Sequence, residues 1–119
     1  MNDGFSGDKP YEERAWGNFT VVLDEPNVKI KRIVVHSEQR LSLQLHTQRE
    51  EWWKVISGYG EVQLGDEVIS ISPRDTITIK KYQVHRVKNN GLNDLIFVEV
   101  QTGNCKEDDI IRIEDDYGR

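Results

Sequence analysis

Apolar and polar residues alternate along most of the chain with the period of two that is typical of β-strands. The alternation is strictest at 40–46, where Leu41, Leu43 and Leu45 fall on one side of an extended strand and the even-numbered residues on the other. Turn-forming residues separate the segments, and no stretch combines a helical period with a cap and a stop. Strands are predicted at 20–23, 28–35, 40–46, 52–56, 59–64, 67–71, 76–79, 84–87, 95–101 and 110–113. So many short strands predict an all-β sandwich or small barrel.

The length and composition describe one domain with no membrane or nucleic-acid character. The chain has 119 residues and a mean hydropathy of -0.67, and no apolar run approaches the ~20 residues of a membrane span. Residues 1–10 are polar and predicted to be a flexible leader, with the domain at 11–119. A single cysteine, Cys105, precludes an internal disulfide, and a cytoplasmic location is expected. The net charge of -5 argues against a nucleic-acid partner.

The densest candidate chemistry lies at 40–58. Gln44 and His46 point the same way from one predicted strand, and Glu51 follows five residues after the histidine. His85 comes about 40 residues later, a spacing that a double-sheet roll can bring to a neighbouring strand. Imidazole, carboxylate and amide oxygen together suit Zn²⁺, Mn²⁺, Fe²⁺ or Ni²⁺. Taken singly, each residue is as easily an ordinary polar group on a solvated sheet face.

Other polar residues of this stretch have two interpretations. Arg40 and Ser42 share the predicted face of Gln44, where they can meet a phosphate or sugar oxygen, and the alternative for Arg40 is a solvated charge at a strand edge. Arg49, beside two glutamates, is expected to join a surface salt bridge. Only one of Trp52 and Trp53 can face inward, because adjacent strand residues point in opposite directions.

Residues 38–58 resemble the first conserved motif of the cupin superfamily, G-x5-H-x-H-x(3,4)-E-x6-G. Gln44 takes the first histidine position, His46 the second, and Glu51 and Gly58 their own positions. The second motif, G-x5-P-x-G-x2-H-x3-N, falls on 74–89 and keeps His85 and its final asparagine. Turn residues of the two motifs are replaced by Glu38, Arg74, Lys80 and Tyr82.

From about residue 11 onward the chain is similar to the type II mannose-6-phosphate isomerase cupin domain. The similarity is carried by 14–17, 28–35, 40–46, 51–53, 55–58 and the ending 107–119. It implies a double-stranded β-helix, that is, a cupin jelly-roll barrel. It also implies a divalent metal, most simply zinc with Mn, Fe, Ni or Co as alternatives. The ligands that it implies are Gln44, His46, Glu51 and His85.

The implied activity interconverts an aldose phosphate and a ketose phosphate, mannose 6-phosphate and fructose 6-phosphate, through a cis-enediol. Arg40 is the candidate catalytic residue, and Arg40, Ser42 and Arg119 are candidates for binding the phosphosugar. The family commonly has an H-H-H-R-x-E-H-W run, in which this chain carries Thr47, Gln48 and Trp52 instead of histidines.

Four other expectations accompany the resemblance. The replacement of three of the family's histidines favours an alternative in which the domain binds a metal and a sugar without isomerising the sugar. A different cupin enzyme, such as a dioxygenase or a nucleotide-sugar epimerase, is a further alternative. The family's domain usually follows a nucleotidyltransferase domain, which these 119 residues do not include, so guanylyltransferase activity is not implied. A homodimer is expected, with the N-terminal segment adding a strand to its partner.

Overall fold

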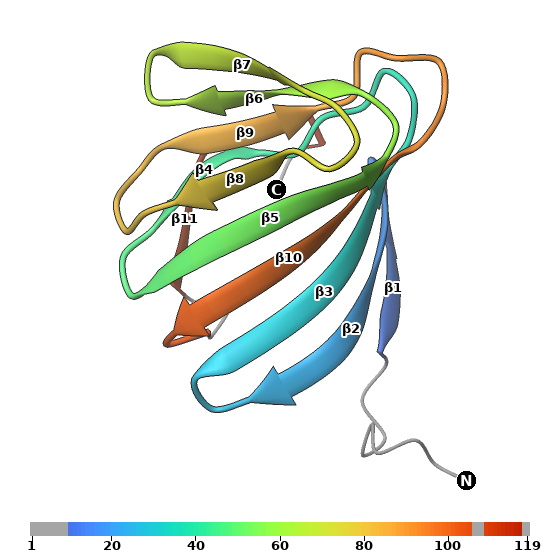
Figure 1. Ribbon diagram of the computed structural model, residues 1–119. Coiled ribbons are helices and arrows are strands. Elements are labelled where there is room, and N and C mark those ends of the chain that lie inside the picture. The colour runs from blue at the N-terminus through green and yellow to red at the C-terminus, as the bar shows by residue number, and fades with distance from the viewer. Residues whose placement is uncertain (1–9, 106–108, 118–119) are drawn as a thin grey trace, which may run out of the picture.

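The computed structural model describes residues 10–105 and 109–117 (Figure 1). These residues contain no α-helix, and therefore none with the length and apolar character that crossing a membrane requires. Their strands are β1 (Tyr11–Arg14), β2 (Gly17–Glu25), β3 (Val28–Val35), β4 (Leu43–His46), β5 (Arg49–Ser57), β6 (Gly60–Leu64), β7 (Glu67–Ile71), β8 (Thr76–Ile79), β9 (His85–Lys88), β10 (Leu95–Gly103) and β11 (Ile110–Glu114). The all-β prediction is confirmed.

The strands form two antiparallel sheets that face each other. One sheet has the order β1-β2-β3-β10-β5-β8, and the other has the order β11-β4-β9-β6-β7. Figure 1 shows β5, β10, β3 and β2 curving along one side, with β6, β7 and β9 across from them. Several neighbours in the sheets are distant in sequence, as in the pairing of β10 with both β3 and β5. This is the double-stranded β-helix that the resemblance implies.

Four segments differ from the predicted strands by three residues or more. β2 begins at Gly17, three residues before the predicted start at 20. The strand predicted at 40–46 begins only at Leu43, and Arg40 forms no more than an isolated bridge with Lys88. β5 begins at Arg49, three residues before the predicted start. β1 was not predicted, because its sequence is charged and does not alternate, and it pairs with β2 of its own chain. Apart from Pro10, the predicted leader at 1–10 lies outside the described residues.

The core between the sheets is apolar at one end and polar at the other. Leu95 and Phe97 on the inner face of β10 are fully buried, and the Phe97 ring lies 4.7 Å from the Trp53 ring. Glu99 and Gln101 continue the same inner face, and both are buried as well. The barrel thus has an apolar base and a polar interior.

The two tryptophans of β5 divide as expected. Trp53 is 3% exposed and packs in the core, whereas Trp52 is 41% exposed on the outer surface. The prediction that only one of them faces inward is confirmed. Since Glu51 is two residues before Trp53, it shares the inward direction.

Candidate metal centre

Three ligand-type side chains from three strands meet inside the barrel. His46 is the last residue of β4, Glu51 is the third residue of β5, and His85 is the first residue of β9. One ligand atom from each lies within 4.8 Å of the other two, and each residue is only 2–3% exposed. His46 Nε2 and Glu51 Oε2 are 3.0 Å apart. Buried side chains of this kind are found together where they bind a common partner or one another.

The geometry of these side chains fits a divalent metal. The ligand atoms of His46, Glu51 and His85 lie within 4.8 Å of one another, close enough to bind one ion. His85 Nδ1 lies 2.9 Å from the Gln83 carbonyl oxygen, which can only accept, so Nδ1 carries the proton and Nε2 keeps its lone pair. The indole N–H of Trp53 donates to Glu51 Oε1 over 3.0 Å and orients the carboxylate. Such outer partners are typical of metal ligands.

Gln44 lies beside this cluster. It is directly opposite His85 in the pairing of β4 with β9, and it shares its strand face with His46. Its amide donates to the hydroxyl of Ser42 over 3.0 Å. The structure therefore brings the four predicted ligand residues to one place, while the role of Gln44 as a ligand stays a prediction.

Arg49 contacts the cluster directly. Its Nη2 lies 3.0 Å from Glu51 Oε2 and 3.3 Å from His46 Nε2, and its Nε donates to the same carboxylate oxygen over 3.1 Å. The side chain is 3% exposed. Arg49 does form a salt bridge, with Glu51, but its expected surface position is wrong, because Arg49 is the first residue of β5 and its side chain lies on the buried face.

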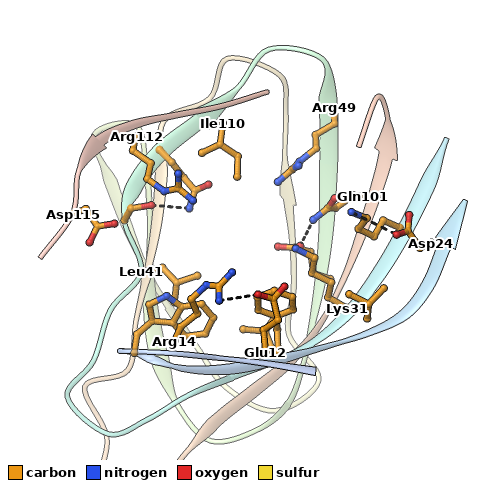
Figure 2. Close-up of a pocket in the computed structure, with 18 residues that line it drawn as sticks. Glu12, Arg14, Asp24, Lys31, Leu41, Arg49, Gln101, Ile110, Arg112 and Asp115 are labelled. Atoms are coloured by element: carbon orange, nitrogen blue, oxygen red, sulfur yellow. Dashed lines mark hydrogen bonds and ion pairs between the residues drawn. The ribbon is translucent and has the colours of Figure 1, made fainter. Parts of the chain in front are cut away.

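A cavity of about 450 Å³ lies next to the cluster (Figure 2). Gln44, Ser42 and Arg49 line it, but His46, Glu51 and His85 do not. The cavity also contains charges of both signs. The cationic lining residues are Arg14, Lys29, Lys31, Arg49 and Arg112, and the acidic ones are Glu12, Asp24, Glu99 and Asp115. Such a wall can bind the anionic and hydroxyl groups of a small polar ligand.

The candidate substrate residues are placed differently from one another. Ser42 is buried and lines the cavity. Arg40 is not among the lining residues: its guanidinium binds both carboxylate oxygens of Asp116, at 2.6 and 2.9 Å, on the protein surface. Arg40 was predicted to share a strand face with Gln44. This prediction is wrong, because the regular strand starts only at Leu43. Arg119 lies outside the described residues.

The carboxylates of the interior are perturbed in opposite directions. Burial opposes ionisation of Glu51, but the hydrogen bond and charge of His46, aided by the charges of His85 and Arg49, hold the pKa of Glu51 below its ordinary value. Burial and the neighbouring Glu51 raise the pKa of Glu99 to about 8, with Lys31 opposing the rise. Glu51 is therefore ionised at neutral pH, whereas Glu99 is protonated.

Sequence analysis overlooked Glu99. Its signal is nevertheless present at 95–101, where Leu95, Phe97, Glu99 and Gln101 continue one face of a strand. A glutamate on an otherwise apolar inward face is either paired or neutralised. Gln101 donates to Glu99 Oε1 over 2.6 Å, and the carboxyl group lines the cavity.

The raised pKa of Glu99 predicts a pH dependence of stability. Between the ordinary carboxyl pKa of 4.5 and about 8, the folded protein holds a proton that the unfolded chain releases, so the free energy of unfolding falls as pH rises. Burial lowers the pKa of His85, which has the opposite effect, but only below its ordinary value of 6.5. In metal-free protein the expected slope from pH 6.5 to 8 is up to about 1.4 kcal/mol per pH unit.

Denaturant unfolding of metal-free Glu99→Gln at a series of pH values tests this expectation. The substitution mimics the protonated carboxyl and removes the slope, whereas Glu67→Gln on the exposed face of β7 leaves it unchanged. An equal slope in Glu99→Gln and the wild type would show that Glu99 does not titrate in this range.

The fold and the ligand cluster together define a cupin. Residues 8–115 match the family model described as Mannose-6-phosphate isomerase C-terminal, so the chain belongs to this family. The family expected from the sequence motifs is thereby confirmed.

Relatives of the chain are bacterial proteins that are much longer. It is 42% identical to the xanthan biosynthesis protein XanB of Xanthomonas campestris pv. campestris over 107 residues, which are 89% of this chain and 23% of that protein. It is 39% identical to the alginate biosynthesis protein AlgA of Pseudomonas aeruginosa over 107 residues, 89% of this chain and 22% of AlgA. It is 37% identical to the mannose-1-phosphate guanylyltransferase of Salmonella muenchen, over 88% of this chain and 22% of that protein. The chain spans less than a quarter of these proteins.

Solved structures support the same fold. A double-stranded β-helix protein of Klebsiella pneumoniae is 27% identical with a TM-score of 0.72, covering 81% of this chain and 83% of that one. A putative sugar phosphate isomerase of Acidithiobacillus ferrooxidans is 22% identical with a TM-score of 0.60. The match covers 64% of this chain and 50% of that one. The protein is thus a cupin domain related to sugar-phosphate enzymes.

Proposed function

We propose that the domain is a metal-dependent aldose–ketose isomerase that interconverts mannose 6-phosphate and fructose 6-phosphate. The observation that carries the proposal is the cluster of His46, Glu51 and His85 beside a cavity lined by cationic side chains. Membership of the mannose-6-phosphate isomerase family supports the choice of sugar. A cavity of about 450 Å³ has the size of a small-molecule site.

In this proposal Gln44, His46, Glu51 and His85 hold the metal, and we propose zinc because two imidazoles and a carboxylate are its usual ligands. A metal held by these residues would act as a Lewis acid on the sugar oxygens at C1 and C2. The protein's part is to hold these ligands in place: Trp53 orients the carboxylate, and the Gln83 carbonyl fixes the His85 tautomer.

The cavity wall supplies the groups that bind and reprotonate the sugar. Lys31 and Arg112 are proposed to attract its phosphate, and Ser42 to bind a sugar hydroxyl, because all three line the cavity. Glu99 is the proposed carrier of the proton between the two carbons, since its carboxyl lines the same cavity. It acts in its ionised form, which accepts the proton from one carbon and returns it to the other, and this form becomes populated as the pH approaches the Glu99 pKa of about 8. Arg40 is left out, because Asp116 binds its guanidinium outside the cavity.

A second candidate function is a metal- and sugar-binding module without isomerase activity. The residues after His46 favour it, since Thr47, Gln48 and Trp52 stand where the family commonly has histidines. The guanylyltransferase name belongs to relatives of which the chain spans 22%. The homodimer and the cytoplasmic location stay predictions.

A coupled assay separates the two candidates. Purified protein loaded with Zn²⁺ is given mannose 6-phosphate, and fructose 6-phosphate is measured by a linked enzyme. The isomerase proposal predicts turnover that a chelator removes and added metal restores. Turnover no higher than in the chelated control would reject the isomerase and leave the binding module.

A further inference from the structure

We propose that Arg49 is an internal cation that occupies the metal site, and that a divalent metal binds by displacing its guanidinium from His46 and Glu51 into the cavity. This inference rests on the metal site of the proposed function. It concerns how that site is filled, and not which reaction follows.

The contacts of Arg49 are those that a metal would need. Two of its nitrogens donate to Glu51 Oε2, and Nη2 also lies 3.3 Å from His46 Nε2. These two atoms, 3.0 Å apart, belong to two of the three residues that could hold a metal. A carboxylate oxygen that already accepts from a guanidinium and faces an imidazole has no free lone pair for a further cation. Metal and guanidinium therefore compete for the same atoms.

The position of Arg49 also controls access. The side chain lines the cavity, whereas the three ligands of the cluster do not and are almost wholly buried. In Figure 2 Arg49 extends from its strand into the cavity. The guanidinium thus lies between the open space and the ligands. A metal that arrives through the cavity reaches Glu51 only when Arg49 moves.

A second position for the guanidinium is available. Arg49 Nη1 is buried with no hydrogen-bond partner among the described residues, and so is Gln101 Oε1. Arg49 pairs across the sheet with Gly103, which has no side chain, and Gln101 is the diagonal neighbour on the same strand. Long side chains reach such diagonal neighbours. A donor and an acceptor that lack partners line one cavity, so rotation of Arg49 toward Gln101 satisfies both.

The test is the affinity for Zn²⁺ of the metal-free protein, measured by competition with a chromophoric chelator. Arg49→Met removes the competing cation and keeps the length of the side chain, so it is expected to bind Zn²⁺ at least about tenfold more tightly than the wild type. Arg49→Lys keeps the charge but forms a single contact, and its affinity is expected to fall between the two.

Arg14→Met is the matched control. It removes the same charge from the same cavity, but Arg14 pairs with Glu12 at 3.0 Å and donates to the Glu13 carbonyl oxygen, away from the three ligands. Its affinity is expected to stay within about twofold of the wild type, because a more distant charge is screened. An equal gain in Arg14→Met would show a general charge effect and overturn the proposal.

Two further outcomes decide the proposal. If Arg49→Met binds Zn²⁺ with the affinity of the wild type, the proposal is overturned. If that variant does not fold without metal, Arg49→Lys takes its place, and wild-type affinity in Arg49→Lys overturns the proposal. The sugar assay is independent of this result. Tighter binding in Arg49→Met without turnover in any variant supports the displacement and rejects the isomerase, whereas turnover with unchanged affinity rejects the displacement alone.

Discussion

Glu51→Gln is expected to lower the affinity for Zn²⁺ by at least about 100-fold, since even changes to outer partners of metal ligands cost 10- to 100-fold. The amide keeps the shape of the side chain and can still accept from Trp53, but it lacks the charge that attracts the metal. It also leaves Arg49 buried without its partner, at a cost of about 3–5 kcal/mol in the free energy of unfolding. The turnover predicted by the isomerase proposal is expected to fall with the metal.

Glu50→Gln is the control for this substitution. Glu50 precedes Glu51 on β5 and is exposed on the outer face, so the same chemical change is expected to alter neither affinity nor stability. A double variant, Glu51→Gln with Arg49→Met, removes both buried charges and is expected to recover stability without recovering metal binding. Wild-type affinity in Glu51→Gln would show that the carboxylate is not a ligand.

Gly58→Ala is expected to lower the free energy of unfolding by at least about 3 kcal/mol. Gly58 follows β5 with a φ of 87°, and a Cβ there would lie 2.3 Å from the Asp94 carbonyl oxygen and 2.8 Å from the Leu95 Cα. Both neighbours are backbone atoms, so neither can move without disturbing the start of β10. This is the physical reason for a glycine at the end of the first cupin motif.

The matched control for this prediction is Gly65→Ala. Gly65 also has a positive φ, 58°, in the turn between β6 and β7, but nothing lies within 4 Å of an added Cβ. Only the backbone conformation then opposes alanine, at about 1–2 kcal/mol. Chemical denaturation of the two variants separates conformation from crowding. Equal losses would show that the strand after Asp94 adapts to the extra methyl group.

Elements with a clear alternation and strong turn residues were predictable from the sequence. The strands at 28–35 and 67–71 have the predicted bounds, and 76–79 lies between a Ser-Pro turn and a polar loop as expected. The start of β4 was not predictable. Apolar and polar residues still alternate at 40–42, although the backbone there forms only an isolated bridge. Because the strand starts at Leu43, Arg40 does not share a strand face with Gln44.

The site was predictable only as far as the strand period reaches. Alternation places Gln44 and His46 on one face, but the approach of Glu51 and His85 depends on which strands pair, and here the family motif was needed. The ion pair of Arg49 with Glu51 was predictable from their closeness on one strand, but its burial was not, because the contact with His46 comes from another strand.

The central claim is that the cluster of His46, Glu51 and His85, together with Gln44, binds one divalent metal. Its most direct test is the metal content of purified protein after saturation with Zn²⁺ and removal of excess, measured by elemental analysis beside Gln44→Ala and His85→Ala. About one equivalent per chain in the wild type, and clearly less in both variants, is the predicted result. A wild type that retains no more metal than the variants would contradict it.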